Sequence, residues 1–139
     1  METANLSINQ ISPEAFTWYL SYLAALDAKD IEKYGRFLAE DCVMIQNNNP
    51  PVTGKDAILA GLGKYWQTFG KLEHELLNIY GTDHAFALEA CNHYTRLDGE
   101  KVTVRAVALT DRNANGLVRR FRVYTDVSPV FATTAPKQN

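Results

Sequence analysis

Four residues that could take part in chemistry alternate along one β-prone segment near the C-terminus: Arg120, Arg122, Tyr124 and Asp126. Side chains two positions apart lie on the same face of a strand, so we expect all four on one face of a sheet. There Asp126 could accept a proton as a general base, and Tyr124 could donate a hydrogen bond to a developing oxyanion. The two arginines would hold Asp126 ionised, and they would also attract a carboxylate-bearing ligand.

A second set of side chains, Glu89, Cys91 and His93, alternates along an earlier segment. If Asp98-Gly99 forms a two-residue hairpin turn, Glu89 lies opposite Ala108 on the next strand. One sheet face is then expected to hold Glu89, Cys91, His93, Arg120, Arg122, Tyr124 and Asp126. The other face is apolar and is expected to hold Leu88, Ala90, Val107, Leu109, Phe121 and Val123.

Three helices are expected ahead of these strands. The first begins after Ser12, because Ser12, Pro13 and Glu14 are typical of an N-cap, a first-turn proline and a first-turn acid. Asp30 can cap a second helix that continues to Leu38. The third opens at residues 53–56, Thr-Gly-Lys-Asp, which resemble a capping box, and Gly70 is a plausible stop.

The strands are expected at residues 41–46, 72–80, 85–97, 102–110 and 117–127. Helices gathered at the N-terminus and antiparallel strands at the C-terminus predict an α+β fold. In this fold three N-terminal helices pack on a strongly curved, mostly antiparallel sheet. We expect one domain over residues 1–139, with its core at about 12–131, and a small-molecule pocket in the concavity of the sheet.

The composition excludes several classes of function. A chain of 139 residues with 46% hydrophobic and 22% charged residues is typical of one globular domain. A net charge of -2 and a pI near 5.9 give no reason to expect nucleic acid or an anionic membrane as a partner. The longest apolar stretch, residues 15–26, is too short to cross a bilayer, and the first residues lack signal-peptide features. A cytoplasmic location is therefore expected.

The cysteines and histidines indicate neither a metal nor a cofactor. Cys42 and Cys91 are widely spaced and form no CxxC motif, so we expect two small buried side chains. His74, His84 and His93 show no metal-ligand spacing with nearby carboxylates.

Several short motifs resemble the nuclear transport factor 2-like superfamily, and its ketosteroid isomerase and SnoaL-like polyketide cyclase branches most of all. Residues 22–30 and 38–41 resemble the opening of those proteins, and 54–58 resemble the helix opening after their first strand. Residues 122–126 resemble their closing Tyr-x-Asp strand. The order of elements agrees over roughly residues 12–131. The superfamily holds isomerases, cyclases, dehydratases, epoxide hydrolases and non-enzymatic scaffolds, so the resemblance implies a fold and not one activity.

The resemblance to ketosteroid isomerase is partial. It places Tyr22 where that enzyme has its oxyanion-donating tyrosine, and Gln46 where it has an aspartate base. An amide cannot abstract a proton from carbon, and the second oxyanion donor would fall near Ala106 or Val107, where no acid stands. Steroid isomerisation by that mechanism is therefore not expected.

Two other branches can be compared in the same way. The epoxide hydrolase branch needs an Arg-x-Asp motif where this chain has Glu89-Ala90-Cys91, although Asp126 matches its closing aspartate. The polyketide cyclase branch uses an acid of the closing strand as its base, and Asp126 fits that position.

The resemblance implies that the face carrying Asp126 looks inward, toward the helices. The pocket is then expected to hold Tyr19, Tyr22, Gln46, Trp66, Glu89, His93, Arg120, Arg122, Tyr124 and Asp126. The apolar face would be left without helices, and a second copy of the chain is the expected cover. A homodimer through the sheets follows.

The resulting hypothesis is a SnoaL-like enzyme that performs cofactor-free acid–base chemistry, of a cyclase or isomerase type, on an oxygenated ring compound. Asp126 would be its base, and Tyr22 with Tyr124 would donate hydrogen bonds. The alternative is a non-catalytic dimeric module that binds a ligand or another protein. Structural roles also stay open: Tyr22 as a core residue, Asp126 as an arginine partner or a strand-end cap, His93 as a structural histidine, and Arg120 and Arg122 as a surface stripe salt-bridged with Glu89.

Overall fold

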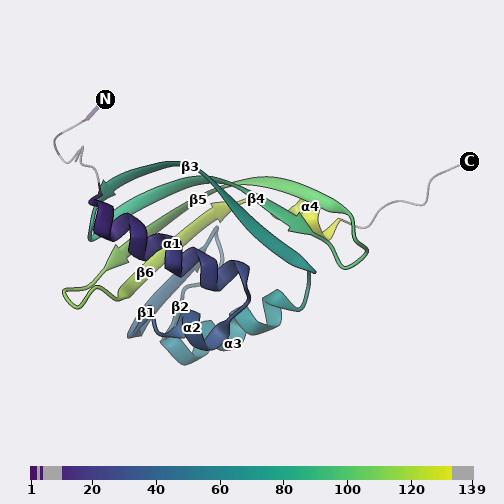
Figure 1. Ribbon diagram of the computed structural model, residues 1–139, viewed down its shortest axis with the longest axis horizontal. Helices are drawn as coiled ribbons and strands as arrows, with labels where there is room; N and C mark the ends of the chain where they lie inside the picture. The colour runs from purple at the N-terminus through teal and green to yellow at the C-terminus, as the bar shows by residue number, and fades with distance from the viewer. Residues whose placement is uncertain (3, 5–10, 133–139) are drawn as a thin grey trace, which may run out of the picture.

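The path of the chain is given by a computed structural model, which describes residues 1–2, 4 and 11–132 (Figure 1). The elements follow one another as α1 (Pro13–Asp27), α2 (Ile31–Gly35), β1 (Leu38–Gln46), β2 (Val52–Thr53), α3 (Lys55–Trp66), β3 (Lys71–Thr82), β4 (Ala85–Thr95), β5 (Lys101–Arg112), β6 (Val118–Thr125) and α4 (Ser128–Phe131).

The first two helices begin where the sequence predicts. The Ser12 hydroxyl accepts a hydrogen bond from the Ala15 amide at 3.1 Å, and Pro13 fills the first helical position. Asp30 caps α2 by accepting a hydrogen bond from the Lys33 amide at 3.0 Å. The second helix is shorter than expected, because Leu38 already pairs with β6 as the first residue of β1.

The third helix begins in a different way from the expected capping box. Its N-cap is Gly54, which has a φ of 99° and makes no side-chain cap, while Thr53 is paired with β1 as part of β2. A left-handed φ of this size favours glycine, so the backbone fixes the start of this helix. The helix ends at Trp66, before Gly70.

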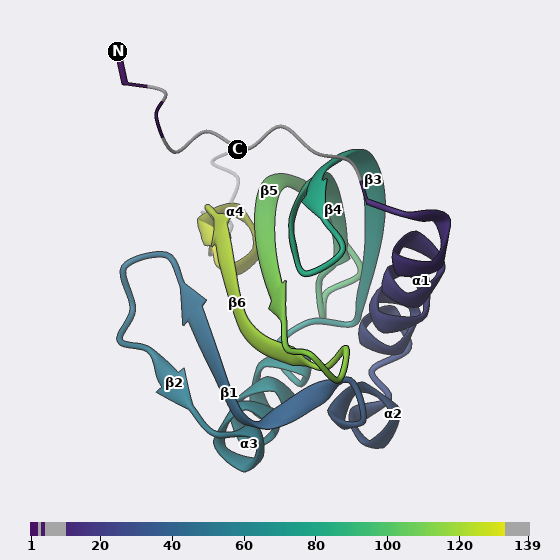
Figure 2. The same ribbon diagram turned by 90° about the vertical axis from the view of Figure 1, so that its left-hand side faces the viewer.

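The six strands form one curved, open sheet in the order β2-β1-β6-β5-β4-β3. The pair β1 and β6 is parallel, and the other described pairs are antiparallel. Figure 2 shows α1 beside β3 and α3 below β1, so that the helices line the hollow of the sheet. The predicted α+β architecture is therefore confirmed.

The β4–β5 hairpin differs from the prediction by one residue. Arg96 and Glu100 close the hairpin through a hydrogen bond of 2.8 Å, and the loop between them is Leu97-Asp98-Gly99, with Gly99 at a φ of 87°. This is the three-residue hairpin loop with a glycine bulge, whereas a two-residue turn was expected. Glu89 consequently pairs with Val107 instead of Ala108, and a shift of one residue turns every side chain of β5 to the opposite face.

The orientation of the sheet is also the reverse of what the resemblance implied. Leu88, Ala90 and Phe121 are buried in the core under the helices, together with Val104 and Ala106 of β5. The outer face carries Glu89, Arg105, Val107 and Tyr124, all exposed. The rule that the apolar face of a sheet meets the core therefore holds here. The apolar surface expected to bind a second copy is thus mostly interior.

Candidate functional site

A cavity of about 130 Å³ lies in the hollow of the sheet, lined by residues of α1, α3 and the inner faces of the strands. Its walls are mainly apolar. Of the ten residues predicted for the pocket, four line this cavity: Tyr19, Tyr22, Gln46 and Trp66.

A histidine and an aspartate form a hydrogen-bonded pair at the wall of this cavity. The Nδ1 atom of His74, on β3, lies 2.5 Å from Oδ1 of Asp27, the last residue of α1. The backbone amide of His74 also donates to Oδ2 of Asp27 at 3.3 Å. The imidazole is held by this carboxylate, and its side chain is 12% exposed. Nε2 is thus the ring nitrogen that is left for a ligand.

The strand next to β3 adds an amide to this wall. Asn92 of β4 lies directly opposite His74 in the register of the two strands and lines the same cavity. It is 6% exposed, and its Oδ1 atom is buried without a hydrogen-bond partner among the described residues. Buried polar atoms are nearly always paired, so this oxygen marks a place for a ligand group or water.

Two pairs of tyrosine hydroxyls also line the cavity. The hydroxyls of Tyr22 and Tyr34 lie 2.8 Å apart, and those of Tyr65 and Tyr94 lie 2.9 Å apart. Burial is the main cause that raises the pKa of all four phenols, so they keep their protons at neutral pH. One hydroxyl of each pair donates to the other, which leaves one O–H per pair able to donate to a ligand.

The predicted base, Asp126, lies outside the cavity. It follows the end of β6, and its carboxylate accepts a hydrogen bond from the Ser128 amide at 3.0 Å. Hydrogen bonds from Ser128 lower the pKa of this exposed carboxyl group. Its placement beside Tyr22 in the pocket was wrong, because the inner face of β6 is formed by Phe121, Val123 and Thr125.

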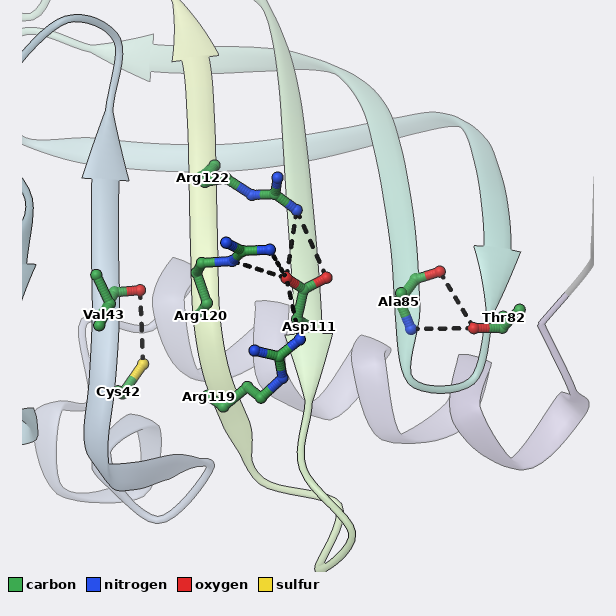
Figure 3. A network of polar contacts seen from close by, with 8 residues as sticks. All are labelled: Cys42, Val43, Thr82, Ala85, Asp111, Arg119, Arg120 and Arg122. Carbon is green, nitrogen blue, oxygen red and sulfur yellow. Dashed lines mark hydrogen bonds and ion pairs between the residues drawn. The ribbon is translucent and has the colours of Figure 1, made fainter. Parts of the chain in front are cut away.

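The two predicted arginines bind a carboxylate of the protein itself. Figure 3 shows Arg120 and Arg122 converging on Asp111 of β5, together with Arg119. Nε of Arg120 donates to Asp111 at 2.9 Å, and a terminal nitrogen of Arg122 lies 3.3 Å from the same oxygen. These arginines lie on the outer face, so their expected place in the pocket was also wrong.

The remaining predicted residues lie on the outer face as well. His93 is hydrogen bonded to Glu75 at 2.8 Å and to Thr103 at 2.7 Å. Glu89 accepts a hydrogen bond from Asn78, and Tyr124 is exposed. Glu89, Tyr124 and Asp126 line an open depression near the end of β6, which meets the cavity wall at Ala90, Ala106 and Thr125. Their placement was wrong for the same reason as that of the arginines.

Sequence reasoning missed the residues that matter most at the cavity wall. The spacing of the histidines bears on His74 only as a metal ligand, and Asn92 stands between Cys91 and His93, which the sequence predicts on the pocket-facing side of the sheet. Asp27 is part of the segment that carries the family resemblance, yet no local pattern links it to His74, which lies 47 positions away. The alternation along β4 was a usable signal for Asn92, since it groups this residue with Ala90 and Tyr94.

The structure also bears on a metal site and on a membrane-spanning helix. Within residues 1–2, 4 and 11–132, no group of three or more His, Cys, Asp or Glu side chains could hold a metal ion. No helix in that part of the chain has the length and hydropathy needed to span a membrane.

Comparisons with known proteins point to one family. The model of the family described as SnoaL-like domain matches residues 19–121. A search of curated proteins found no match. One similar solved structure is that of a protein from Shewanella denitrificans OS-217 described as a SnoaL-like polyketide cyclase. The two superpose with a TM-score of 0.75 at 14% sequence identity, and the match covers 84% of this chain and 93% of that one.

Two further solved structures share the fold. An LEH-like epoxide hydrolase of Mycobacterium tuberculosis has a TM-score of 0.70 at 19% identity, covering 85% of this chain and 86% of that one. A protein of Catenulispora acidiphila DSM 44928 with a ketosteroid isomerase-like fold, in complex with trimethylamine, has a TM-score of 0.72 at 16% identity, covering 86% and 90%. Identities this low establish the fold and leave the activity open.

Proposed function

The chain belongs to the SnoaL-like domain family, and from that premise we propose that it is a cofactor-free acid–base enzyme that moves a proton on a small oxygenated ring compound. The observation that carries the proposal is the Asp27–His74 pair at the wall of the apolar cavity. Folds of this family commonly bind small molecules or host cyclases and isomerases, and the pair supplies a base for such chemistry.

His74 is the proposed general base. An imidazole can take a proton from carbon or oxygen, provided that its other ring nitrogen is held in the correct tautomer. Asp27 supplies that support, because it accepts from Nδ1 and leaves Nε2 for the substrate. Asp27 therefore acts as a positioning residue, and it also stabilises the imidazolium that forms when His74 gains a proton.

The tyrosine pairs are the proposed donors to negative charge on the substrate oxygen. Removing a proton next to a carbonyl group develops an oxyanion, which hydrogen-bond donors in a dry site stabilise strongly. Tyr22 and Tyr34 form the more deeply buried pair, and one of their two protons is available to an acceptor. The role expected of Tyr22 from the sequence is kept in this proposal, while Asp126 is replaced by His74 as the base.

The size of the cavity limits the substrate. An apolar cavity of about 150 Å³ in another protein binds benzene. The volume here is about 130 Å³, which suits a compound with a single six-membered ring. A four-ring steroid would extend beyond a cavity of this volume.

Deuterium exchange tests this proposal without knowledge of the natural substrate. The protein is incubated in D₂O with cyclohexanone and 2-cyclohexen-1-one, and loss of the proton signals next to the carbonyl group is followed by NMR. We expect acceleration over buffer that falls about a hundredfold or more in His74→Gln, since a general base contributes about 10²- to 10⁴-fold. The matched control is His93→Gln, which changes a histidine on the outer face and should leave the rate unchanged.

Two results would count against enzymatic proton transfer. Exchange that is equally fast in wild type and His74→Gln would exclude His74 as the base. Tight binding of the ketones without any exchange would favour the non-catalytic ligand-binding alternative.

Assembly as a homodimer is a further part of the proposal, and the surface now proposed is the outer face of the sheet. Leu77, Tyr80, Val107 and Tyr124 are exposed large apolar residues of β3, β5 and β6. The same face carries Arg105 and Glu89, so a two-fold axis can bring unlike charges together. Light scattering should report twice the 15.6 kDa chain mass, and Val107→Glu should give the monomer.

A cytoplasmic location is also proposed, in keeping with the two free cysteines.

A further inference from the structure

The unpaired oxygen of Asn92 bears on what the cavity binds. Asn92 lines the cavity at 6% exposure, and Oδ1 has no hydrogen-bond partner among the described residues. An unmade hydrogen bond at a buried acceptor is unfavourable, and the cost is removed when a donor arrives. A carbonyl oxygen only accepts, so the arriving group must carry an O–H or N–H.

The position of Asn92 places that donor next to the proposed base. Asn92 and His74 are direct cross-strand partners on the inner face of the sheet. Side chains in this relationship have Cβ atoms about 4.5–5.5 Å apart. A ligand group held by Asn92 therefore lies beside the imidazole, and the two strands fix this arrangement.

The charges around the cavity limit the ligand further. Among the described residues that line the cavity there is neither a lysine nor an arginine, and the arginines expected there pair with Asp111 on the outer face. An anionic ligand would lose its hydration without gaining a cationic partner, apart from an imidazole that is already paired with Asp27. The cavity thus favours a neutral ring compound.

We propose that the substrate class is a neutral single-ring compound with a hydroxyl group, which donates its hydrogen bond to Asn92 Oδ1 and so lies next to His74. This inference rests on the proposed function in taking His74 as the base, and it adds Asn92 as the residue that determines specificity. A ring ether or ketone without a donor leaves the amide oxygen unpaired and is bound less well. A site with a buried polar group discriminates strongly against analogues that cannot pair with it.

Calorimetry with three probes of similar size tests the inference: phenol, toluene and benzoate. Wild type is expected to bind phenol at least tenfold more tightly than toluene and to bind benzoate more weakly than phenol. Asn92→Leu should reverse the order, because leucine has a similar volume and no polar atom. Asn78→Leu makes the same change on the outer side of β3, where Asn78 bonds Glu89, and should keep the wild-type order.

The reversal is informative because a misfolded variant would lose all binding. Should Asn92→Leu fail to fold, Asn92→Ala provides the same comparison with a smaller side chain. Equal affinity of wild type for phenol and toluene would overturn the inference, as would a phenol preference that survives both substitutions. A phenol preference that depends on Asn92, in a protein that binds the ketones but exchanges no deuterium, supports the inferred ligand class and rejects the enzymatic proposal. Deuterium exchange that depends on His74, without a preference for phenol over toluene, supports the enzymatic proposal and rejects the inferred ligand class.

Discussion

The Nζ atom of Lys29 lies 4.5 Å from the centre of the Phe69 ring and donates a hydrogen bond to the carbonyl oxygen of the same residue at 2.8 Å. It also donates to the carbonyl oxygens of Trp66 at 2.7 Å and Gly70 at 3.2 Å. These carbonyls lie at and just after the C-terminus of α3, where helical carbonyl groups lack partners within the helix. One side chain from the turn after α1 thus holds the segment that carries Trp66 to the cavity.

Replacing this lysine should destabilise the protein. Lys29→Met keeps most of the alkyl chain but removes the donors, and we expect the free energy of unfolding to fall by about 2 kcal/mol, since hydrogen bonds to charged groups contribute about 1.5–3 kcal/mol. Urea denaturation measures the change. Lys33→Met, on an exposed position of α2, is the control and should have little effect. Similar losses in both variants would show that the three carbonyl contacts contribute nothing specific.

Asp27 is expected to act through His74. Asp27→Asn preserves the shape of the side chain but no longer offers a carboxylate to Nδ1, so the proton-exchange rate should fall about ten- to hundredfold while ketone binding changes little. Saturation kinetics by NMR separates the two effects. Asp126→Asn should leave the rate unchanged, because Asp126 lies outside the cavity. If Asp126→Asn lowers the rate and Asp27→Asn does not, the base has been assigned to the wrong residue.

The Asp83 carboxylate should make stability depend on pH in the acid range. Hydrogen bonds from the amide and the hydroxyl of Ser12, each 2.7 Å long, lower the pKa of Asp83 below its ordinary value. A lowered folded-state pKa stabilises the protein above the unfolded value, and this contribution is lost as the pH falls through the folded one. Asp83→Asn should therefore be less stable than wild type at pH 6. The difference should shrink below about pH 4, the ordinary range of aspartate. Thermal melts at both pH values measure it, and a constant difference would contradict the linkage.

The thiol of Cys42 should be inert in the native protein. It is fully buried beside β2, with Sγ 4.0 Å from the Val43 carbonyl oxygen (Figure 3), and burial raises its pKa to about 12. Thiolate is the reactive form, so little reaction is expected at pH 8. In a Cys91→Ala background, a thiol reagent should label Cys42 only after urea is added. Rapid labelling of the native protein would show that the β1–β2 edge opens.

Local chemistry explains which parts of the fold could be predicted from the sequence. Ser12 and Asp30 were recognised as helix caps because a cap depends on residues within one turn of the chain. The order of helices and strands followed from the same kind of short-range pattern.

The candidate site depends on longer-range features that such patterns do not encode. One additional residue in the loop before Glu100 moved β5 by one position, and one position is enough to exchange the two faces of a strand. The choice of inner face came from the closing aspartate of the resembled family, although the apolar character of Leu88 and Phe121 already pointed the other way. The contact between Asp27 and His74 exists only once α1 is packed on β3.

The parallel pairing of β1 with β6 has a consequence for how the molecule is made. During synthesis β1 leaves the ribosome long before β6, and until β6 arrives its only described sheet neighbour is the two-residue strand β2. Contacts between distant parts of a chain form late, because closing the intervening loop costs entropy first. The meander of β3, β4 and β5 can form before that, and it already offers α1 a surface to pack on, since Tyr19 lies edge-on against Phe86 of β4. Pulse-labelled hydrogen exchange during refolding should find β1 and β6 protected together and after the meander. The wall of the cavity that holds Met44, Phe121 and Val123 therefore closes last, and until then the apolar side of the meander is exposed to chaperones.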